Sequence, residues 1–256
     1  MRYSGVEASV HCRRRGSIPL RLNKNETMKT KITEACIVTL LFCYGAQAAV
    51  VVVPGTSDPW LAGMPNGTPA SSGDVAPTQS PVLVTGIAIT PGSAYRFAAS
   101  GAVGNDPAYP TEAPDGNAGI ITPHVPGAEN GIADLTAPLN SLVGIFLGVN
   151  RPDLSVAPGG LDFTTAASRD FLTLSPALQQ PFFIGDGLTS GSIIQQIIAP
   201  TGATRLFLGT MDGAGWYNNP GSFTVTVVPE PTTAAIVLAG ILSGCFYRRN
   251  TKRSTS

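Results

Sequence analysis

The central part of this chain lacks several residue types on which common functions depend. Between Ala49 and Val228 there is no cysteine and no lysine, and His124 is the single histidine. The lack of cysteine excludes disulfides, thiolate nucleophiles and cysteine-based metal sites from this body. Twelve acidic residues against four arginines leave it with a charge of about −8, which repels nucleic-acid phosphates. We therefore expect no binding to nucleic acid.

The sequence also lacks the motifs of common enzymes. It contains no Gly-x-Ser-x-Gly, no P-loop and no dinucleotide-binding fingerprint. Paired carboxylates serve glycosidases, but scattered aspartates and glutamates without a cleft do not define such a pair. We expect the protein not to be an enzyme.

Residues 28–48 have the features of a secretory signal peptide, namely a basic start, a short apolar run and small residues at the end. The apolar run is too short to span a bilayer, which argues against a membrane helix. Because Met28 opens a complete signal, we interpret residues 1–27 as a non-native or disordered extension. The predicted cleavage site consists of Ala46, Ala48 and Ala49, and we expect cleavage between Ala48 and Ala49.

Residues 229–253 combine three features in a fixed order: a Pro-Glu-Pro motif, an apolar stretch of about fifteen residues and a cationic end. Such a stretch inserts in a membrane with its basic end in the cytoplasm, and it is short for a stable span. The order resembles the PEP-CTERM sorting signal of Gram-negative bacteria. The motif residues are Pro229, Glu230, Pro231, Arg248 and Arg249.

The PEP-CTERM resemblance implies processing by an exosortase, a membrane protease, and an association with exopolysaccharide production. It predicts a secreted or cell-envelope protein that is anchored at its C-terminus, transiently or stably, by a hydrophobic transmembrane helix. An ordinary C-terminal membrane anchor is the alternative interpretation.

Short apolar segments separated by Gly, Pro, Asn and Asp fill residues 81–228. Phe223, Val225 and Val227 alternate with polar residues, which is typical of a half-buried strand. Helical periodicity is confined to the two membrane-directed ends. These patterns predict an all-β fold, an antiparallel β-sandwich or jelly roll, flanked by a signal helix and a C-terminal hydrophobic helix. We expect residues 49–80 to be an irregular lead-in to this domain.

The most informative internal segment is a glycine-rich loop between two strands. Asp212, Asn218 and Asn219 offer one carboxylate and two amide oxygens from this loop. Hard oxygen donors of low net charge suit Ca²⁺ better than zinc or copper. The same residue types also favour a plain hairpin turn for backbone reasons. The spacing alone leaves both interpretations open.

The loop resembles the Asp-loop-Asn-Asn-x-Gly-Ser-Phe segment of LecA-type lectins, which are small calcium-dependent, galactose-binding jelly rolls. The resemblance covers roughly residues 80–228, and further short matches occur in the family's order. It implies calcium binding through the three side chains above, with backbone oxygens from Gly215 and from a residue near Asn105. The further matches are Pro91-Gly92, Ala98-Ala-Ser-Gly101, Ala113-Pro-Asp-Gly116 and Leu142-Val-Gly-Ile145.

Two departures from the lectin pattern affect the predicted site. The loop after Asp212 is one residue shorter than in the lectins, and this affects whether Gly215 matches the position of the family's backbone ligand. The sugar-contacting His and Gln of the family have no secure match, and His124 is a loose counterpart. Trp216 and Tyr217 beside the loop are suited to stack on a sugar face, or to pack on the edge of the sandwich.

Two functions from different classes follow from these patterns. The first is a structural or adhesive envelope protein in which calcium only rigidifies loops. The second is a calcium-dependent carbohydrate-binding module that acts on exopolysaccharide.

Overall fold

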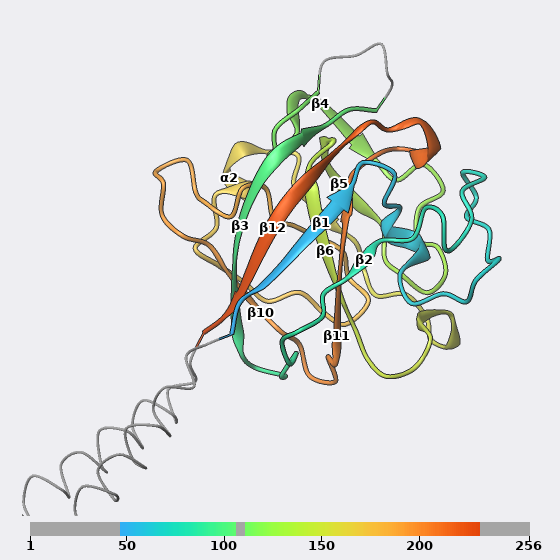
Figure 1. Ribbon diagram of the computed structural model, residues 1–256, viewed down its shortest axis with the longest axis horizontal. Coiled ribbons are helices and arrows are strands. Elements are labelled where there is room, and N and C mark those ends of the chain that lie inside the picture. The colour runs from blue at the N-terminus through green and yellow to red at the C-terminus, as the bar shows by residue number, and fades with distance from the viewer. Residues whose placement is uncertain (1–46, 106–110, 231–256) are drawn as a thin grey trace, which may run out of the picture. The chain divides into compact units, whose positions relative to one another are not determined.

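The computed structural model describes residues 47–105 and 111–230, which form an all-β domain with short helical turns (Figure 1). The predicted all-β class is confirmed. No helix within these residues is long and apolar enough to cross a membrane. The apolar cores of the signal peptide and of the sorting tail lie outside the described residues.

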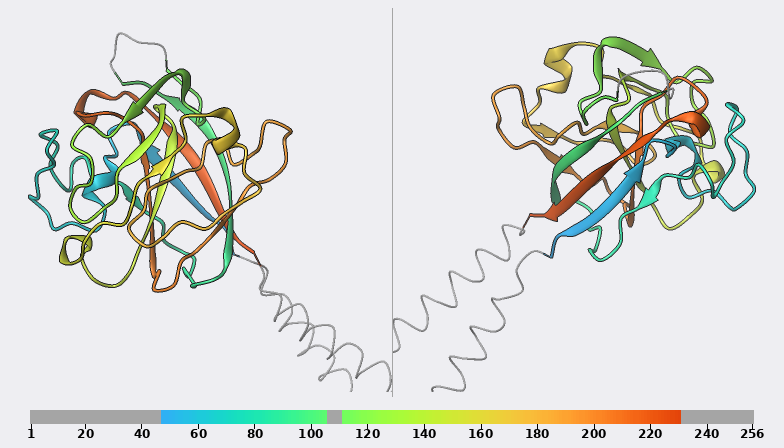
Figure 2. Two further views of the ribbon diagram at one scale, coloured as in Figure 1. Left: turned by 180° about the vertical axis from the view of Figure 1, so that it is seen from behind. Right: turned by 45° about the horizontal axis from the view of Figure 1, so that its top comes forward.

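The first sheet has five strands, and its three longest lie side by side (Figure 2). The middle one of these three long strands, β12, pairs antiparallel with a neighbour on each side. The last two strands of the sheet pair in parallel. Phe223, Val225 and Val227 of β12 are buried and alternate with more exposed residues, which confirms the predicted half-buried strand. In spatial order the strands are β1 (Ala49–Pro54), β12 (Gly221–Pro229), β3 (Ala94–Val103), β10 (Gln196–Ile198) and β8 (Thr173–Leu174).

The second sheet has four strands, and its two longest pair antiparallel over six residue pairs. All six residues of one of them, Leu142–Leu147, are buried, so this strand is covered on both faces. In order the strands are β2 (Val82–Leu83), β11 (Arg205–Thr210), β6 (Leu142–Leu147) and β9 (Phe182–Phe183). A third, small sheet consists of β4 (Asn117–Pro123), β5 (Leu135–Leu139) and β7 (Leu161–Asp162).

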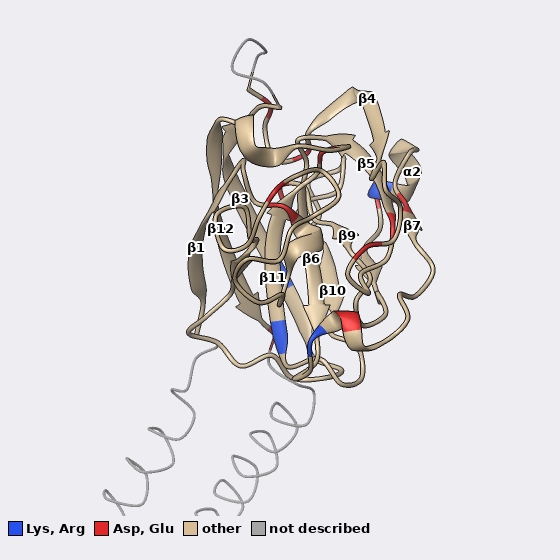
Figure 3. Cartoon of the chain, turned by 90° about the vertical axis from the view of Figure 1, so that its right-hand side faces the viewer, with Lys and Arg blue, Asp and Glu red and all other residues tan. Residues whose placement is uncertain are grey.

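The core lies between the first two sheets, which form separate layers (Figure 3). Tyr95 of β3 and Phe146 of β6 meet across it with ring centroids 6.0 Å apart. The hydroxyl of Tyr95 donates to the carbonyl of Ala88 and accepts from the amide of Thr90, so its polar end is satisfied. Burying such rings is a main source of stability in a domain without disulfides.

The predicted irregular lead-in at residues 49–80 is wrong for its first six residues. These form β1, which pairs with β12 in continuous register from Ala49 opposite Val227 to Pro54 opposite Ser222. The remainder, residues 55–80, contains no strand but covers the second sheet. Its short 3-10 helix η1 (Pro59–Leu61) packs on β11 and β6.

The alternating exposure of β1 allows a direct test of its place in the sandwich. Val53 is fully buried, whereas Val52 beside it is 56% exposed. We expect Val53→Ala to lower the free energy of unfolding by about 2 kcal/mol, because it removes buried methyl groups and leaves a cavity. Val52→Ala should cost less than about 1 kcal/mol. Equal effects in chemical denaturation of the full chain would contradict this assignment.

Candidate functional site

Three chain segments meet at the end of β11: the loop 211–220, the lead-in 55–80 and the loop 124–134. The hydroxyl of Thr210, the last residue of β11, donates to the carbonyl of Gly55. A side chain at Gly55 would lie 2.8 Å from the carbonyl oxygens of Asn219 and Pro220, so only glycine allows this approach. The lead-in is therefore pressed against the predicted calcium loop.

The structure brings together two of the predicted calcium ligands, Asp212 and Asn219. The side-chain amide of Asn219 donates to Oδ2 of Asp212 over 2.9 Å, and the amide of Gly213 donates to Oδ1. Both side chains are buried, with 7% exposure for Asp212 and 3% for Asn219. Oδ1 of Asn219 has no hydrogen-bond partner among the described residues, which is costly for a buried oxygen.

The other predicted ligands lie close by along the chain. Gly215 has φ +80° and precedes the 3-10 helix η3 (Trp216–Asn218), so Asn218 ends this helix directly before Asn219. Asn105 follows the end of β3, where the amide of Gly104 donates to the carbonyl of Pro220 over 3.0 Å. The ends of β3 and β11 and the start of β12 therefore meet at this loop.

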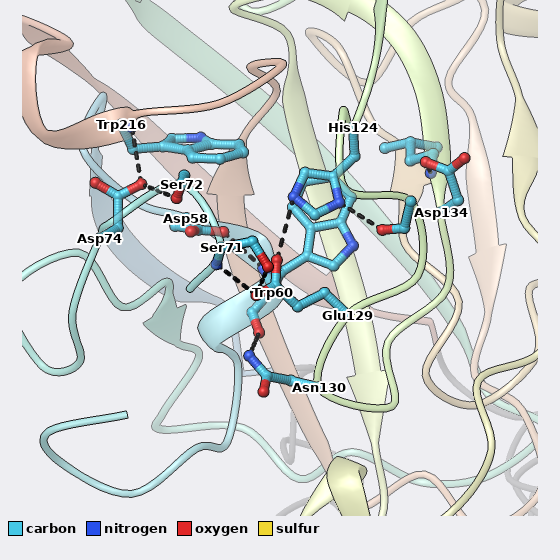
Figure 4. A network of polar contacts seen from close by, with 12 residues as sticks. Asp58, Trp60, Ser71, Ser72, Asp74, His124, Glu129, Asn130, Asp134 and Trp216 are labelled. Atoms are coloured by element: carbon cyan, nitrogen blue, oxygen red, sulfur yellow. Dashed lines mark hydrogen bonds and ion pairs between the residues drawn. The ribbon is translucent and has the colours of Figure 1, made fainter. Parts of the chain in front are cut away.

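Trp216 and His124 are both buried, so Trp216 follows the packing alternative and His124 has no surface to offer a sugar. Trp216 is fully buried, and its indole N–H donates to the carbonyl of Thr210 over 2.9 Å. His124 is only 2% exposed and stacks on Trp60 with ring centroids 3.5 Å apart and planes 8° from parallel (Figure 4). Tyr217 alone, at 69% exposure, presents a ring to solvent.

His124 packs between its own loop, residues 124–134, and Trp60 of the lead-in. Its Nδ1 lies 2.6 Å from the carbonyl oxygen of Gly127, and its Nε2 lies 3.6 Å from Oε2 of Glu129. Burial lowers the pKa of the imidazole, which favours the neutral ring. Oε1 of Glu129 accepts from the backbone and side chain of Ser71, so the same carboxylate holds the lead-in.

Two aspartates of the lead-in belong to the site, although the sequence analysis did not single them out. Oδ2 of Asp74 accepts from the amide of Trp216 over 3.0 Å and from the hydroxyl of Ser72 (Figure 4). Oδ1 of Asp58 accepts from the amide of Trp60 over 2.9 Å, and this bond begins η1. One oxygen of each carboxylate, Oδ1 of Asp74 and Oδ2 of Asp58, has no hydrogen-bond partner among the described residues.

The sequence signal for Asp58 was the Asp-Pro-Trp order, which suits the start of a helical turn. Asp74 had no such signal. Asp74 is buried because of how residues 55–80 fold, and the sequence of these residues has no helical or strand periodicity that would predict this fold.

Three carboxyl groups are thus buried close to one another, and none has a cationic partner among the described residues. Exposure is 0% for Asp58, 1% for Asp74 and 7% for Asp212. The pKa of Asp58 is raised to about 8, mainly by burial and in part by the charges of Asp74, Glu129 and Asp212, against the lowering effect of the hydrogen bond from the Trp60 amide. Burial also raises the pKa of Asp212, against the lowering effect of its hydrogen bonds. Ionising such buried carboxyl groups without a cation nearby is costly.

The four arginines of the described domain have other partners. Arg96 and Arg151 pair with Glu230 and Asp153, and the other two arginines donate to backbone carbonyls. These contacts are Arg169 to Phe163 and Thr164, and Arg205 to Gly148 and Asn150. Within residues 47–105 and 111–230 no three His, Cys, Asp or Glu side chains form a metal-holding group. A cation here therefore needs amide and backbone oxygens as well as carboxylates.

The start of the predicted sorting motif is part of the folded domain. Pro229 closes β12 opposite Tyr95, and the amide of Glu230 donates to the carbonyl of Ala94 over 2.8 Å. Nε of Arg96 lies 2.8 Å from Oε1 of Glu230. The remaining motif residues lie outside the described part of the chain, namely Pro231, Arg248 and Arg249.

The predicted cleavage site lies beside this motif, on the neighbouring strand of the same sheet, where Ala49 pairs with Val227. Ala48 is exposed, and Ala49 is the first residue of β1. Ala46 lies outside the described residues.

In comparisons with known proteins, no protein-family model matches this chain, and no curated protein matches it at a significant level.

The raised pKa of Asp58 predicts how stability depends on pH. Between pH 3.8 and about 8 the unfolded chain has ionised Asp58 while the folded chain keeps it protonated, so the folded state loses stability as pH rises. We expect Asp58→Asn to remove this loss. In chelator, the difference in unfolding free energy between variant and wild type should grow from pH 4 to pH 8. A pH-independent difference in urea titrations would contradict this account.

Proposed function

We propose that this chain is an exported envelope or extracellular-matrix protein whose β-domain holds Ca²⁺ at the loop 211–220 as a buried structural ion. The observation that carries the proposal is the buried pair of Asp212 and Asn219, in a carboxylate cluster without a cationic partner. A divalent cation would offset this charge. It would be coordinated by the unpartnered Oδ1 of Asn219 and by Asp212 once the Asn219 amide turns and no longer donates to Asp212.

The donor chemistry of the loop fits calcium. Asp212 supplies a carboxylate, Asn218 and Asn219 supply amide oxygens, and the chain at Gly215 and Asn105 supplies backbone carbonyls. All are hard oxygen donors, which Ca²⁺ takes in sets of six to eight. A bound ion would connect the ends of β3 and β11 to the start of β12 and so rigidify one end of the domain. The proposal includes the finer fold, a galactose-binding-like jelly roll.

Burial supports the structural role over a role in which the ion contacts a sugar. A sugar-bridging ion needs an open coordination position, but the lead-in covers this loop. Gly55 lies against Asn219, and Asp74 bonds to the backbone of Trp216. With the lead-in in place, Asp212 and Asn219 have little surface to offer a ligand from solvent.

Carbohydrate binding is the second candidate, and the observation that favours it is Tyr217. Its ring is 69% exposed on η3, beside the proposed calcium loop. Exposed aromatic rings beside polar groups are suited to stack on sugar faces. In this function the calcium positions the loop that carries Tyr217, and exopolysaccharide is the natural ligand class for an exported protein of this kind.

The proposed export and processing agree with the positions of the two predicted processing points. Ala49 pairs with Val227, so the start of β1 lies beside the end of β12, where the Pro-Glu-Pro motif begins. Cleavage after Ala48 leaves every residue of β1 in place. An exosortase-type protease would act on the tail beyond Glu230, and the tail would serve as a transient or stable membrane anchor until then.

The processing prediction concerns the ends of the mature protein. In a Gram-negative host with an exosortase, we expect the protein in the envelope or medium to begin at Ala49 and to lack the C-terminal arginines. Intact-mass measurement and N-terminal sequencing check both ends. Replacing Pro229, Glu230 and Pro231 together by alanine should leave the start at Ala49 and retain the tail. Unchanged tail removal in that variant would support an ordinary anchor or an unrelated protease.

The calcium prediction concerns Asp212. Wild type should bind Ca²⁺ in a calorimetric titration and gain about 2.7 kcal/mol of stability when free calcium is 100 times the dissociation constant. Asp212→Ala should abolish both effects, because it removes a carboxylate ligand. The exposed Asp162 offers a matched control, and Asp162→Ala should bind calcium as wild type does. Equal titrations of wild type and Asp212→Ala would rule out calcium at this loop.

A glycan array with and without chelator separates the two candidate functions. The structural function predicts calcium-dependent stability without chelator-sensitive sugar binding. The carbohydrate function predicts binding that chelator removes and that Tyr217→Ala weakens. Binding that neither treatment changes would contradict the second candidate.

A further inference from the structure

This inference rests on the proposed calcium site and concerns a residue outside the segment that resembles lectins. Asp74 lies in the lead-in, 138 positions before Asp212 in the numbering, yet its carboxylate contacts the loop directly. Its Oδ2 accepts from the amide of Trp216 over 3.0 Å. Trp216 follows Gly215, so this contact falls inside the loop that runs from Asp212 to Asn219.

The free oxygen of Asp74 is the second observation. Asp74 is 1% exposed, and its Oδ1 has no hydrogen-bond partner among the described residues. The hydroxyl of Ser72 and the amide of Trp216 both donate to the other oxygen, which fixes the orientation of the carboxylate. A buried carboxylate oxygen held in this way without a donor is poorly solvated, and a metal ion satisfies it.

Asp74 and Asp212 are buried at the same loop. The Trp216 amide that donates to Asp74 belongs to the segment that begins at Asp212, and both carboxyl groups are almost fully buried. Like charges in a buried site repel unless a cation lies near both. Two carboxylates together carry the charge that a divalent ion neutralises, and calcium sites gain affinity with each added carboxylate.

Asp58 is the competing residue, and its contacts distinguish it from Asp74. Asp58 is equally buried and also has one unpartnered oxygen. Its other oxygen, however, caps its own segment at Trp60 and makes no hydrogen bond to the loop 211–220. Of the two lead-in aspartates, Asp74 is therefore the one that is tied to the calcium loop.

We propose that Asp74 supplies the second carboxylate of the calcium site, so that the bound ion fastens the lead-in 55–80 to the sandwich. The ion then has ligands from two segments that are far apart in the sequence, the lead-in 55–80 and the loop 211–220. Calcium binding and docking of the lead-in become one equilibrium, in which each stabilises the other. In this proposal the lead-in both covers the calcium site and supplies one of its ligands.

Asp74→Asn tests this with little disturbance to the fold. An asparagine oxygen still accepts from Trp216, so the contact remains while the charge is lost. In calorimetric titration of the full chain with calcium chloride, we expect affinity to fall at least about tenfold. Asp162→Asn, which removes an exposed carboxylate outside the site, is the matched control and should keep affinity within about threefold. Unchanged affinity in Asp74→Asn would overturn the proposal and leave Asp74 as a cap for η3.

Hydrogen exchange of the wild type provides a readout that does not depend on any variant folding. Adding calcium to chelated protein should increase amide protection both in residues 211–220 and in residues 68–79. Protection confined to residues 211–220 would overturn the role of Asp74 while leaving the loop site intact. Absence of calcium binding by wild type, or wild-type affinity in Asp212→Ala, would instead show that the proposed calcium function itself has failed.

Discussion

Strand β12 is the element on which the arrangement of the domain depends. It pairs with β1 on one side and β3 on the other, so it joins the N-terminal edge of the sheet to its centre. The proposed calcium loop leads into it at Gly221, and the predicted sorting motif begins at its last residue, Pro229. Fixing this one strand therefore fixes the positions of the loop, the predicted cleavage site and the start of the tail.

The sequence was most informative where side chains alternate along a single strand. Phe223, Val225 and Val227 predicted β12 correctly, because one face of that strand meets the core and the other meets solvent. The same rule failed at β1, where four consecutive valines show no alternation and adjoin the apolar signal segment. The fully antiparallel arrangement was wrong for two short pairs, β10 with β8 and β5 with β7. Such pairs depend on long connections that leave no local pattern.

The candidate site was predictable only in the part that one loop supplies. Asp212 and Asn219 lie seven residues apart, and turn chemistry alone brings them near each other. Their burial could not be read from the sequence, because it results from residues 55–80 folding over the loop. For the same reason the sequence left two roles open for Trp216 and only a loose one for His124: both residues pack with Trp60, a partner from the lead-in.

The scarcity of basic residues in the body leaves the carboxylates under residues 55–80 to be neutralised by a cation that is not part of the chain. Within residues 47–105 and 111–230 the cations are four arginines, each already bonded to a carboxylate or to backbone carbonyls. Folding residues 55–80 over the loop therefore places carboxylates together with no side chain to neutralise them. A protein that folds outside the cytoplasm meets calcium at higher concentrations than one that folds within it, and extracellular modules bind it with dissociation constants of roughly 10⁻⁴–10⁻³ M. The proposed export would therefore expose the domain to calcium, and the proposed ion would neutralise the carboxylates that residues 55–80 bring to the loop.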